Sequence, residues 1–252
     1  MLRNLYCGAV ANVLKYTVDT YLSNIRLILL FSLAFVIAFL IPVFASFPTY
    51  SDAGAIFIRT ASLFVNLNII NTAVIVVAVL FSLLFLSFAV VAINIVVKHS
   101  RTHTKIKKEV MDGLEKYTAK VFAVLLLSTF IVLAVNVASY GKGYSQTLTA
   151  VAGLIMTPFV FYAPASIVID DRRIPHAIMS SLKFFISRFD YSMLWLAIAI
   201  ILLTVFDFIF IAIGGATLSS YLMLAFDSIF ILPFLVLLQS ELYMKRFRLL
   251  SR

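Results

Sequence analysis

Six long apolar runs limit what this chain can fold into. A helix that crosses a membrane needs about 20 mainly apolar residues, and the sequence contains six runs of roughly that length. The runs are continuous and lack the alternation of apolar and polar residues that marks a barrel strand, so they predict helices. We place the spans at about 27–47, 72–97, 121–140, 148–169, 193–213 and 221–243.

The composition supports a membrane location. Hydrophobic residues make up 63% of the chain and charged residues only 12%, whereas about a quarter of the residues are charged in an ordinary soluble domain. The first run starts too late and is too long for a cleaved signal peptide, so we expect it to be retained. We therefore predict one domain, residues 1–252, with an all-α fold: a polytopic membrane helix bundle.

The positions of the basic residues predict the orientation. Short cytoplasmic loops carry an excess of Lys and Arg, and 18 of the 20 basic residues fall on one side of the six-span arrangement. Only Arg59 and Lys142 fall on the other side. We expect a multi-pass cell-membrane protein with both termini in the cytoplasm. Because the charge follows the topology, the net charge of +9 does not indicate a nucleic-acid partner.

Three cytoplasmic segments have the periodicity of amphipathic helices, at about 8–26, 104–118 and 174–189. In the third, Ile174, Ile178, Leu182, Phe185 and Phe189 form an apolar stripe, and His176, Ser180, Lys183 and Ser187 form the opposite one. We expect Asp170 and Asp171 to lie at the N-terminus of this helix, where carboxylates accept from free backbone N–H groups.

These segments predict contact with membrane lipids, anionic ones on the cytoplasmic side. A docking surface for a cytoplasmic or membrane protein partner is the alternative. The residues expected at the lipid interface are Lys105, Lys107, Lys108, Arg172, Arg173, Lys183 and Arg188.

The outer segment 48–71 is too apolar for a free loop and too interrupted for a seventh span. We expect it to lie on the outer face or to dip into the bundle. Four prolines within the spans should kink or unwind their helices: Pro42, Pro158, Pro164 and Pro233. Asn94, Asn136 and Gln239 should form hydrogen bonds between helices.

One stretch carries a family resemblance. The sequence TPFVFYAPASIVIDDRRIPHAIMSSLKFFISRF, 157–189, leads from the fourth span into a cytoplasmic helix. It resembles a loose group of six-helix prokaryotic membrane proteins, which includes the membrane domain fused to glycerophosphodiester phosphodiesterases. The resemblance implies an all-helical membrane bundle, and no activity is implied because the catalytic domain of that fusion has no counterpart here.

No motif of a known catalytic or metal site is present in the sequence. His99 and His103 lie four residues apart and could share a helix face, but we expect them in a solvated basic loop. We therefore predict no catalytic residues, no metal and no cofactor.

Two acids in the last pair of spans are the strongest candidates for a site. Asp207 and Asp227 are equally far from Thr217, in the expected turn, so in a hairpin they lie at one level, about 10 Å beneath the outer end. Facing inward, they would repel one another, and one would hold a proton near neutral pH. They would then carry a proton or cation, or bind Arg59 or Lys142. Facing apart, each would accept a hydrogen bond from a neighbour.

Three functions follow in order of preference. The first is a non-enzymatic membrane scaffold or accessory subunit that contacts lipid or a cytoplasmic partner. The second is a small-solute transporter or channel that uses Asp207 and Asp227. The third is a lipid-modifying enzyme, whose acids should lie nearer the headgroups and beside basic phosphate ligands.

Overall fold

The protein is described by a computed structural model that covers residues 2–44, 49–52, 55–58, 69–102, 106–139 and 141–245. The described chain is almost entirely helical, which confirms the predicted all-α class. The helices are α1 (Leu2–Ser23), α2 (Ile25–Phe44), α3 (Ile69–Thr102), α4 (Ile106–Ala138), α5 (Ser145–Val160), α6 (Ala163–Ile169), α7 (Ile174–Ser187), α8 (Phe189–Phe226), the π-helix η2 (Asp227–Ile231) and α9 (Leu232–Met244).

Six helical segments of the described chain are long and apolar enough to cross a membrane. They are Ile25–Pro42, Ala73–Ser100, Gly113–Ala138, Ser145–Ile169, Phe189–Ile213 and Tyr221–Met244. The predicted number of spans is confirmed, and the chain is a multi-pass integral membrane protein. The segment 104–118 is not a separate helix, because its described residues begin α4 and continue without a break into the third span.

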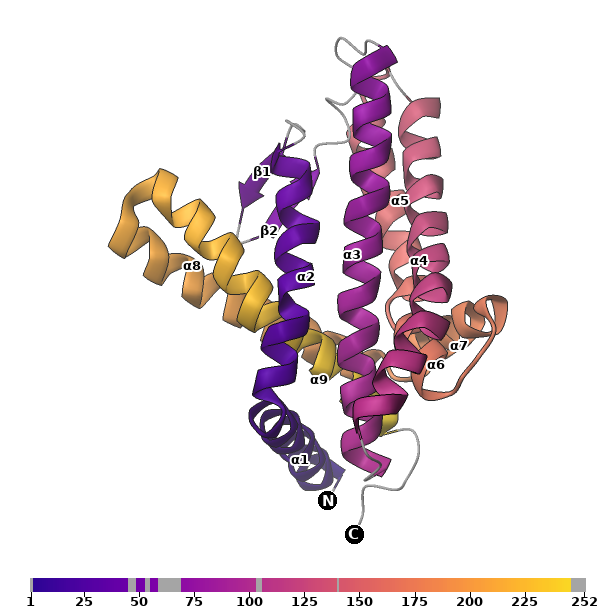
Figure 1. The fold of residues 1–252 in the computed structure, drawn as a ribbon, viewed down its shortest axis with the longest axis vertical. Helices are drawn as coiled ribbons and strands as arrows, with labels where there is room; N and C mark the ends of the chain where they lie inside the picture. The colour runs from indigo at the N-terminus through magenta and orange to yellow at the C-terminus, as the bar shows by residue number, and fades with distance from the viewer. Residues whose placement is uncertain are drawn as a thin grey trace.

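Helices α2 to α5 run side by side along the long axis, and α1 crosses them at one end (Figure 1). The end of α9 lies at that same end. Packing between α3, α4 and α6 centres on fully buried residues, among them Val91, Val121 and Ile167. Gly113 belongs to this contact, since a Cβ atom there would meet Ile95 Cδ1 at 3.0 Å. Such close approach through small residues is how membrane helices gain packing energy.

The fourth span is broken into two helices, α5 and α6, as expected from Pro158. The freed backbone groups have side-chain partners: Ser181 Oγ donates to Pro158 O at 2.8 Å and accepts from Tyr162 N at 2.9 Å. Gln239 Nε2 donates to Phe161 O. A single serine thus satisfies two buried groups that the break would leave unpaired. Pro233 lies in the first turn of α9, directly after η2.

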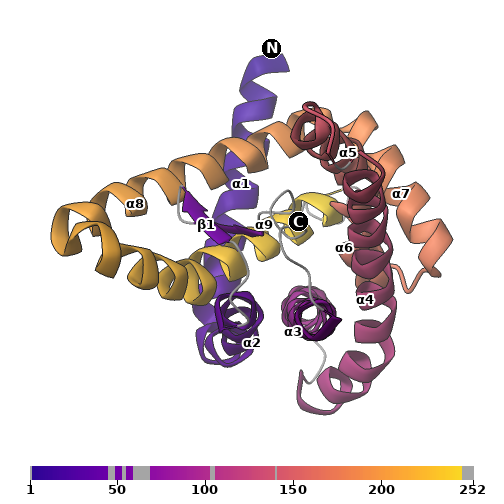
Figure 2. The same ribbon diagram turned by 90° about the horizontal axis from the view of Figure 1, so that it is seen from above.

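Helix α8 folds back on itself and projects obliquely from the bundle (Figures 1 and 2). The rings of Phe206 and Phe226 are 4.6 Å apart and those of Phe210 and Phe226 are 5.4 Å apart. A straight helix would separate residues 206 and 226 by about 30 Å. We call residues 189–231 the arm. Its outgoing span is only 6% buried, as expected of a segment that faces lipid.

Where it is described, the outer segment includes a pair of strands, and its position on the outer face or within the bundle stays a prediction. Strands β1 (Thr49–Asp52) and β2 (Ala55–Ile58) pair antiparallel, with Thr49 opposite Ile58. The pairing satisfies the backbone groups of a segment too interrupted to form a spanning helix. Residues 45–48, 53–54 and 59–68, and with them Arg59, lie outside the described chain.

Candidate functional site

Arg173, the residue before helix α7, has an extended backbone, at φ −72° and ψ 154°, and Pro175 lies in the first turn of the helix. The predicted capping by Asp170 and Asp171 is wrong, because no side-chain cap is present. Asp170 Oδ2 instead accepts from Tyr243 Oη at 2.7 Å and pairs with Arg172 Nε at 3.0 Å. Asp171 pairs with Lys116 and Lys120, at 2.5 and 3.4 Å. Charged and phenolic side chains, most of them from other segments, bind the two carboxylates in place of backbone N–H groups.

The buried face of α7 is shifted from the predicted apolar stripe. Ala177, Ser180, Ser181 and Phe184 are buried, whereas Phe189 is 52% exposed. The small Ala and Ser side chains let α7 approach its neighbours closely, and the serine hydroxyls find partners there. The larger apolar residues of the stripe are left at the edge of this contact.

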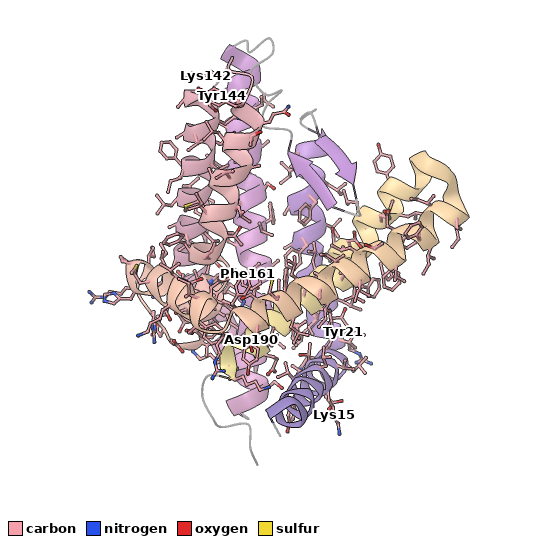
Figure 3. The ribbon with its side chains drawn as sticks, turned by 180° about the vertical axis from the view of Figure 1, so that it is seen from behind. Lys15, Tyr21, Lys142, Tyr144, Phe161 and Asp190 are labelled. Carbon is pink, nitrogen blue, oxygen red and sulfur yellow. The ribbon has the colours of Figure 1, made fainter. Side chains whose placement is uncertain are left out.

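The predicted polar stripe of α7 lines a pocket of about 600 Å³. All four of its residues, His176, Ser180, Lys183 and Ser187, contribute. Nitrogen-tipped side chains project from this helix in Figure 3. The other lining residues come from the segment before α7, from α7 itself, from the start of α8 and from the end of α9: Arg172, Pro175, Met179, Phe184, Arg188, Tyr191 and Lys245.

The pocket is strongly basic. Four Lys or Arg side chains and one His line it, and no Asp or Glu of the described residues does. Arg188 Cζ lies 5.6 Å and Lys245 Nζ 5.4 Å from the centroid of the Tyr191 ring, so two cations contact one aromatic ring. Burial lowers the pKa of Lys245 below its ordinary 10.5, and the positive charge of Arg188 lowers it further, while Asp190 partly offsets both. An anion in the pocket would relieve this repulsion.

A group of hydrogen-bonded and stacked side chains lies next to the residues that line the pocket. Tyr243 Oη, buried, donates to Asp170 Oδ2 and lies 3.3 Å from Ser180 Oγ. The Tyr162 ring packs against those of Phe184 and Tyr243, at 4.7 and 6.0 Å. Asp170 therefore holds Arg172 beside the pocket and ties α9 to the segment before α7.

The sequence analysis identified part of this site. Arg172, Lys183 and Arg188 were expected at a lipid interface, and the structure places all three in the pocket. It missed Tyr191, which follows Arg188 by three residues at the start of α8. It also missed Lys245, which is 57 residues further along the chain than Arg188, so no local pattern connects the two.

The remaining residues expected at the interface lie elsewhere. Arg173 is exposed at the start of α7 and does not line the pocket. Lys107 and Lys108 lie in the first turn of α4, where the backbone alone is described, and Lys105 falls outside the described residues.

The two acids lie on opposite runs of the arm, each next to a ring of the Phe206–Phe226 pair. Asp227 is only 4% exposed, and its Oδ2 atom has no hydrogen-bond partner among the described residues. Asp207 is partly exposed and close enough for its charge to act on Asp227. Lys142 is not brought to them, since it lies 5.8 Å from the Tyr144 ring at the far end of α4 and α5 (Figure 3).

Other polar residues have packing roles. The solvated loop expected for His99 is wrong, because His99 lies in α3 and is 7% exposed, and His103 falls outside the described chain. Ser240 Oγ donates to Asn94 Oδ1 at 2.7 Å and Asn136 Nδ2 to Thr149 Oγ1 at 3.1 Å, which confirms hydrogen bonding between helices. No group of three His, Cys, Asp or Glu side chains in the described ranges could hold a metal ion.

Comparison with protein-family models, with curated proteins and with solved structures finds no match to this chain. The resemblance to the six-helix membrane group stays a prediction.

Proposed function

We propose that this protein is a non-enzymatic membrane scaffold or accessory subunit that binds the headgroup of an anionic phospholipid in the pocket between α7, α8 and α9. One observation carries the proposal. Four Lys or Arg side chains line one cavity, and no carboxylate among the described residues lines it. A phosphate group is the natural ligand of such a site, because it pairs with Arg and Lys through charge-assisted hydrogen bonds.

The depth of the pocket favours a lipid over a soluble anion. Arg172 follows the fourth span by three residues, Arg188 directly precedes the fifth, and Lys245 directly follows the sixth. The three charges therefore lie at the membrane boundary, where phospholipid headgroups are found. Met179 and Phe184 supply an apolar wall to the same cavity, against which the glycerol backbone and the start of an acyl chain would pack.

The charge distribution of the chain supports a cytoplasmic position for this pocket. Its basic residues belong to the side that carries 18 of the 20 Lys and Arg residues, which is the cytoplasmic side by the positive-inside rule. The cytoplasmic leaflet is rich in anionic lipids, and each basic residue near its surface contributes about 1 kcal/mol of attraction.

Native mass spectrometry of the purified protein tests the proposal. The protein is incubated with phosphatidylglycerol or with phosphatidylcholine of the same acyl chains, and the retained lipid is counted. We expect preferential retention of phosphatidylglycerol. The triple substitution of Arg172, Lys183 and Arg188 by Gln should remove that preference. Arg173→Gln, one position from Arg172 but outside the pocket, is the matched control and should retain it.

Two results would contradict the proposal. Equal retention of the two lipids by the unaltered protein would show that the pocket does not select a net negative headgroup. Recovery from mild detergent of a clean monomer, with neither a specific lipid nor a protein partner, would count against the scaffold function as a whole.

A small-solute transporter or channel is the second candidate, and the burial of Asp227 beside Asp207 is the observation that favours it. If both Asp207→Asn and Asp227→Asn leave solute flux in reconstituted vesicles unchanged, the carboxylate mechanism is excluded. A lipid-modifying enzyme is less well supported. Asp170, which is tied to the pocket residue Arg172, is bound by Arg172 and Tyr243 and does not line the cavity.

A further inference from the structure

The arm contains a buried carboxylate that the proposed lipid site does not use. Asp227 begins the π-helix η2, which lies within the span Tyr221–Met244. The Asp227 side chain and that of the adjacent Ser228 are 4% and 1% exposed. Asp227 Oδ2 has no hydrogen-bond partner in the described chain. Single π-turns within helices recur at functional sites, because they offset the backbone hydrogen bonds of one turn.

The charged groups around Asp227 offer it no cation. Helix η2 packs against α2, α8 and α9. The facing run of α8 contributes Asp207, a like charge, and α2 has a single charged residue, Arg26, in its first turn. The charged residues that follow on α9, Glu241 and Lys245, lie about 21 and 27 Å further along the helix at 1.5 Å per residue.

One further titratable group reaches η2. Tyr21 of α1 donates its hydroxyl to Phe230 O, at 3.4 Å, and so contacts the backbone of η2 three residues beyond Asp227. No Lys, Arg or His in the described part of the arm or of α2, apart from Arg26, is available to neutralise two carboxylates.

An ionised carboxylate in this position would be costly for two reasons. It would be buried away from water without a donor at Oδ2, and it would face the charge of Asp207. Uptake of a proton by Asp227 removes both costs at once, since a neutral carboxyl group is cheaply buried and does not repel its neighbour.

We propose that Asp227 and Asp207 form an intramembrane proton-binding pair, in which Asp227 holds the proton and Asp207 is the like charge that favours its uptake. The pair is separate from the basic pocket and does not depend on lipid binding there. It deepens the second candidate function by naming a proton as the ion bound, and it holds whether or not a solute is transported.

Labelling with dicyclohexylcarbodiimide tests the pair in the full chain reconstituted in liposomes. This apolar reagent reacts with protonated carboxyl groups, and the site of the stable N-acylurea adduct is read by peptide mass spectrometry. We expect an adduct on Asp227 near pH 7 that decreases as the pH is raised and the proton is released. Asp190, exposed at the start of the same helix, should stay unlabelled near pH 7 and serves as the internal control.

Two variants and one salt complete the test. Asp207→Asn removes the like charge while keeping the side-chain shape, and it should reduce labelling of Asp227 near pH 7 severalfold. Asp227→Asn should abolish the adduct, and elution of both variants as the unaltered protein does shows that they are folded. Absence of an adduct on Asp227 at every pH, or labelling unaffected by Asp207→Asn, would overturn the pair. If NaCl at constant pH protects Asp227 from labelling, the pair binds a metal cation and not a proton.

Discussion

Lys245→Gln should weaken lipid binding and at the same time stabilise the empty protein. In the folded protein the Lys245 ammonium is partly buried and close to the positive charge of Arg188, and together these lower its pKa below 10.5 despite the attraction of Asp190. A lysine whose folded pKa is lowered binds its proton less tightly after folding. At neutral pH its charge therefore opposes folding, and a neutral side chain removes that penalty.

The size of the binding effect follows from the charge count. A basic residue near an anionic membrane surface contributes about 1 kcal/mol, which corresponds to roughly a fivefold change in a dissociation constant. Lys245 is one of four such side chains at the pocket, so we expect Lys245→Gln to raise the dissociation constant of phosphatidylglycerol about fivefold and to leave a measurable affinity. Opposite changes in affinity and stability are typical of a residue that serves a ligand rather than the fold.

Two assays on the same samples measure these effects. Lipid titration followed by native mass spectrometry gives the dissociation constant, and thermal unfolding in lipid-free detergent gives the midpoint temperature Tm. Lys142→Gln is the matched control, because Lys142 also lies over a tyrosine ring, at 5.8 Å against 5.4 Å for Lys245, but outside the pocket. It should leave lipid affinity unchanged.

The pH dependence provides an independent check. As pH rises toward 10.5, Lys245 loses its proton earlier than an ordinary lysine, so phosphatidylglycerol affinity should fall in this alkaline range. Lys245→Arg should remove that fall, because arginine stays charged. The reasoning is refuted if Lys245→Gln lowers Tm and leaves affinity unchanged, since the side chain would then act only in the fold.

Three further changes test the structure around the pocket. Tyr243→Phe leaves the buried Asp170 carboxylate without one charge-assisted donor and should cost about 2 kcal/mol, measured by equilibrium unfolding in mixed micelles; an unchanged stability would contradict the donor role. Ser181→Ala removes the hydroxyl that bonds two backbone groups at the break between α5 and α6 and should cost about 1–3 kcal/mol of stability. Ser181→Thr should recover part of this loss. Asp171 adopts a left-handed backbone, at φ +51°, so Asp171→Ala should unfold at a lower Tm than Asp171→Gly. Lys116 lowers the pKa of Asp171 below 3.8. The small contribution of the Asp171 carboxylate to stability is therefore present above pH 3.8 and is lost as the pH falls through the pKa of Asp171 in the folded protein. Asp171→Asn should flatten the acid side of the plot of Tm against pH.

The sequence alone was sufficient for the membrane class and the number of spans. Both depend on runs of about 20 apolar residues, and the cost of placing such runs in water outweighs any detail of packing. The break at Pro158 was also predictable, because proline cannot donate the hydrogen bond that continues a helix. The hairpin of the last two spans was predictable from two apolar runs that flank a turn near Thr217, and the contact of Phe206 with Phe226 is the packing that such a turn produces.

The basic pocket was decided only by the tertiary structure. Periodicity identified the polar stripe of α7 but placed it toward lipid headgroups in general, since a helical repeat shows which residues share a face and not what the face meets. Asp170 and Asp171 fitted the local capping pattern, yet Asp170 is bound by Tyr243 and the neighbouring Arg172, and Asp171 by two lysines of α4. Lys245 reached Arg188 and Tyr191 only because α9 packs beside α7 and α8. Contacts between residues far apart in sequence depend on that packing, and they determine where the charges of this chain gather.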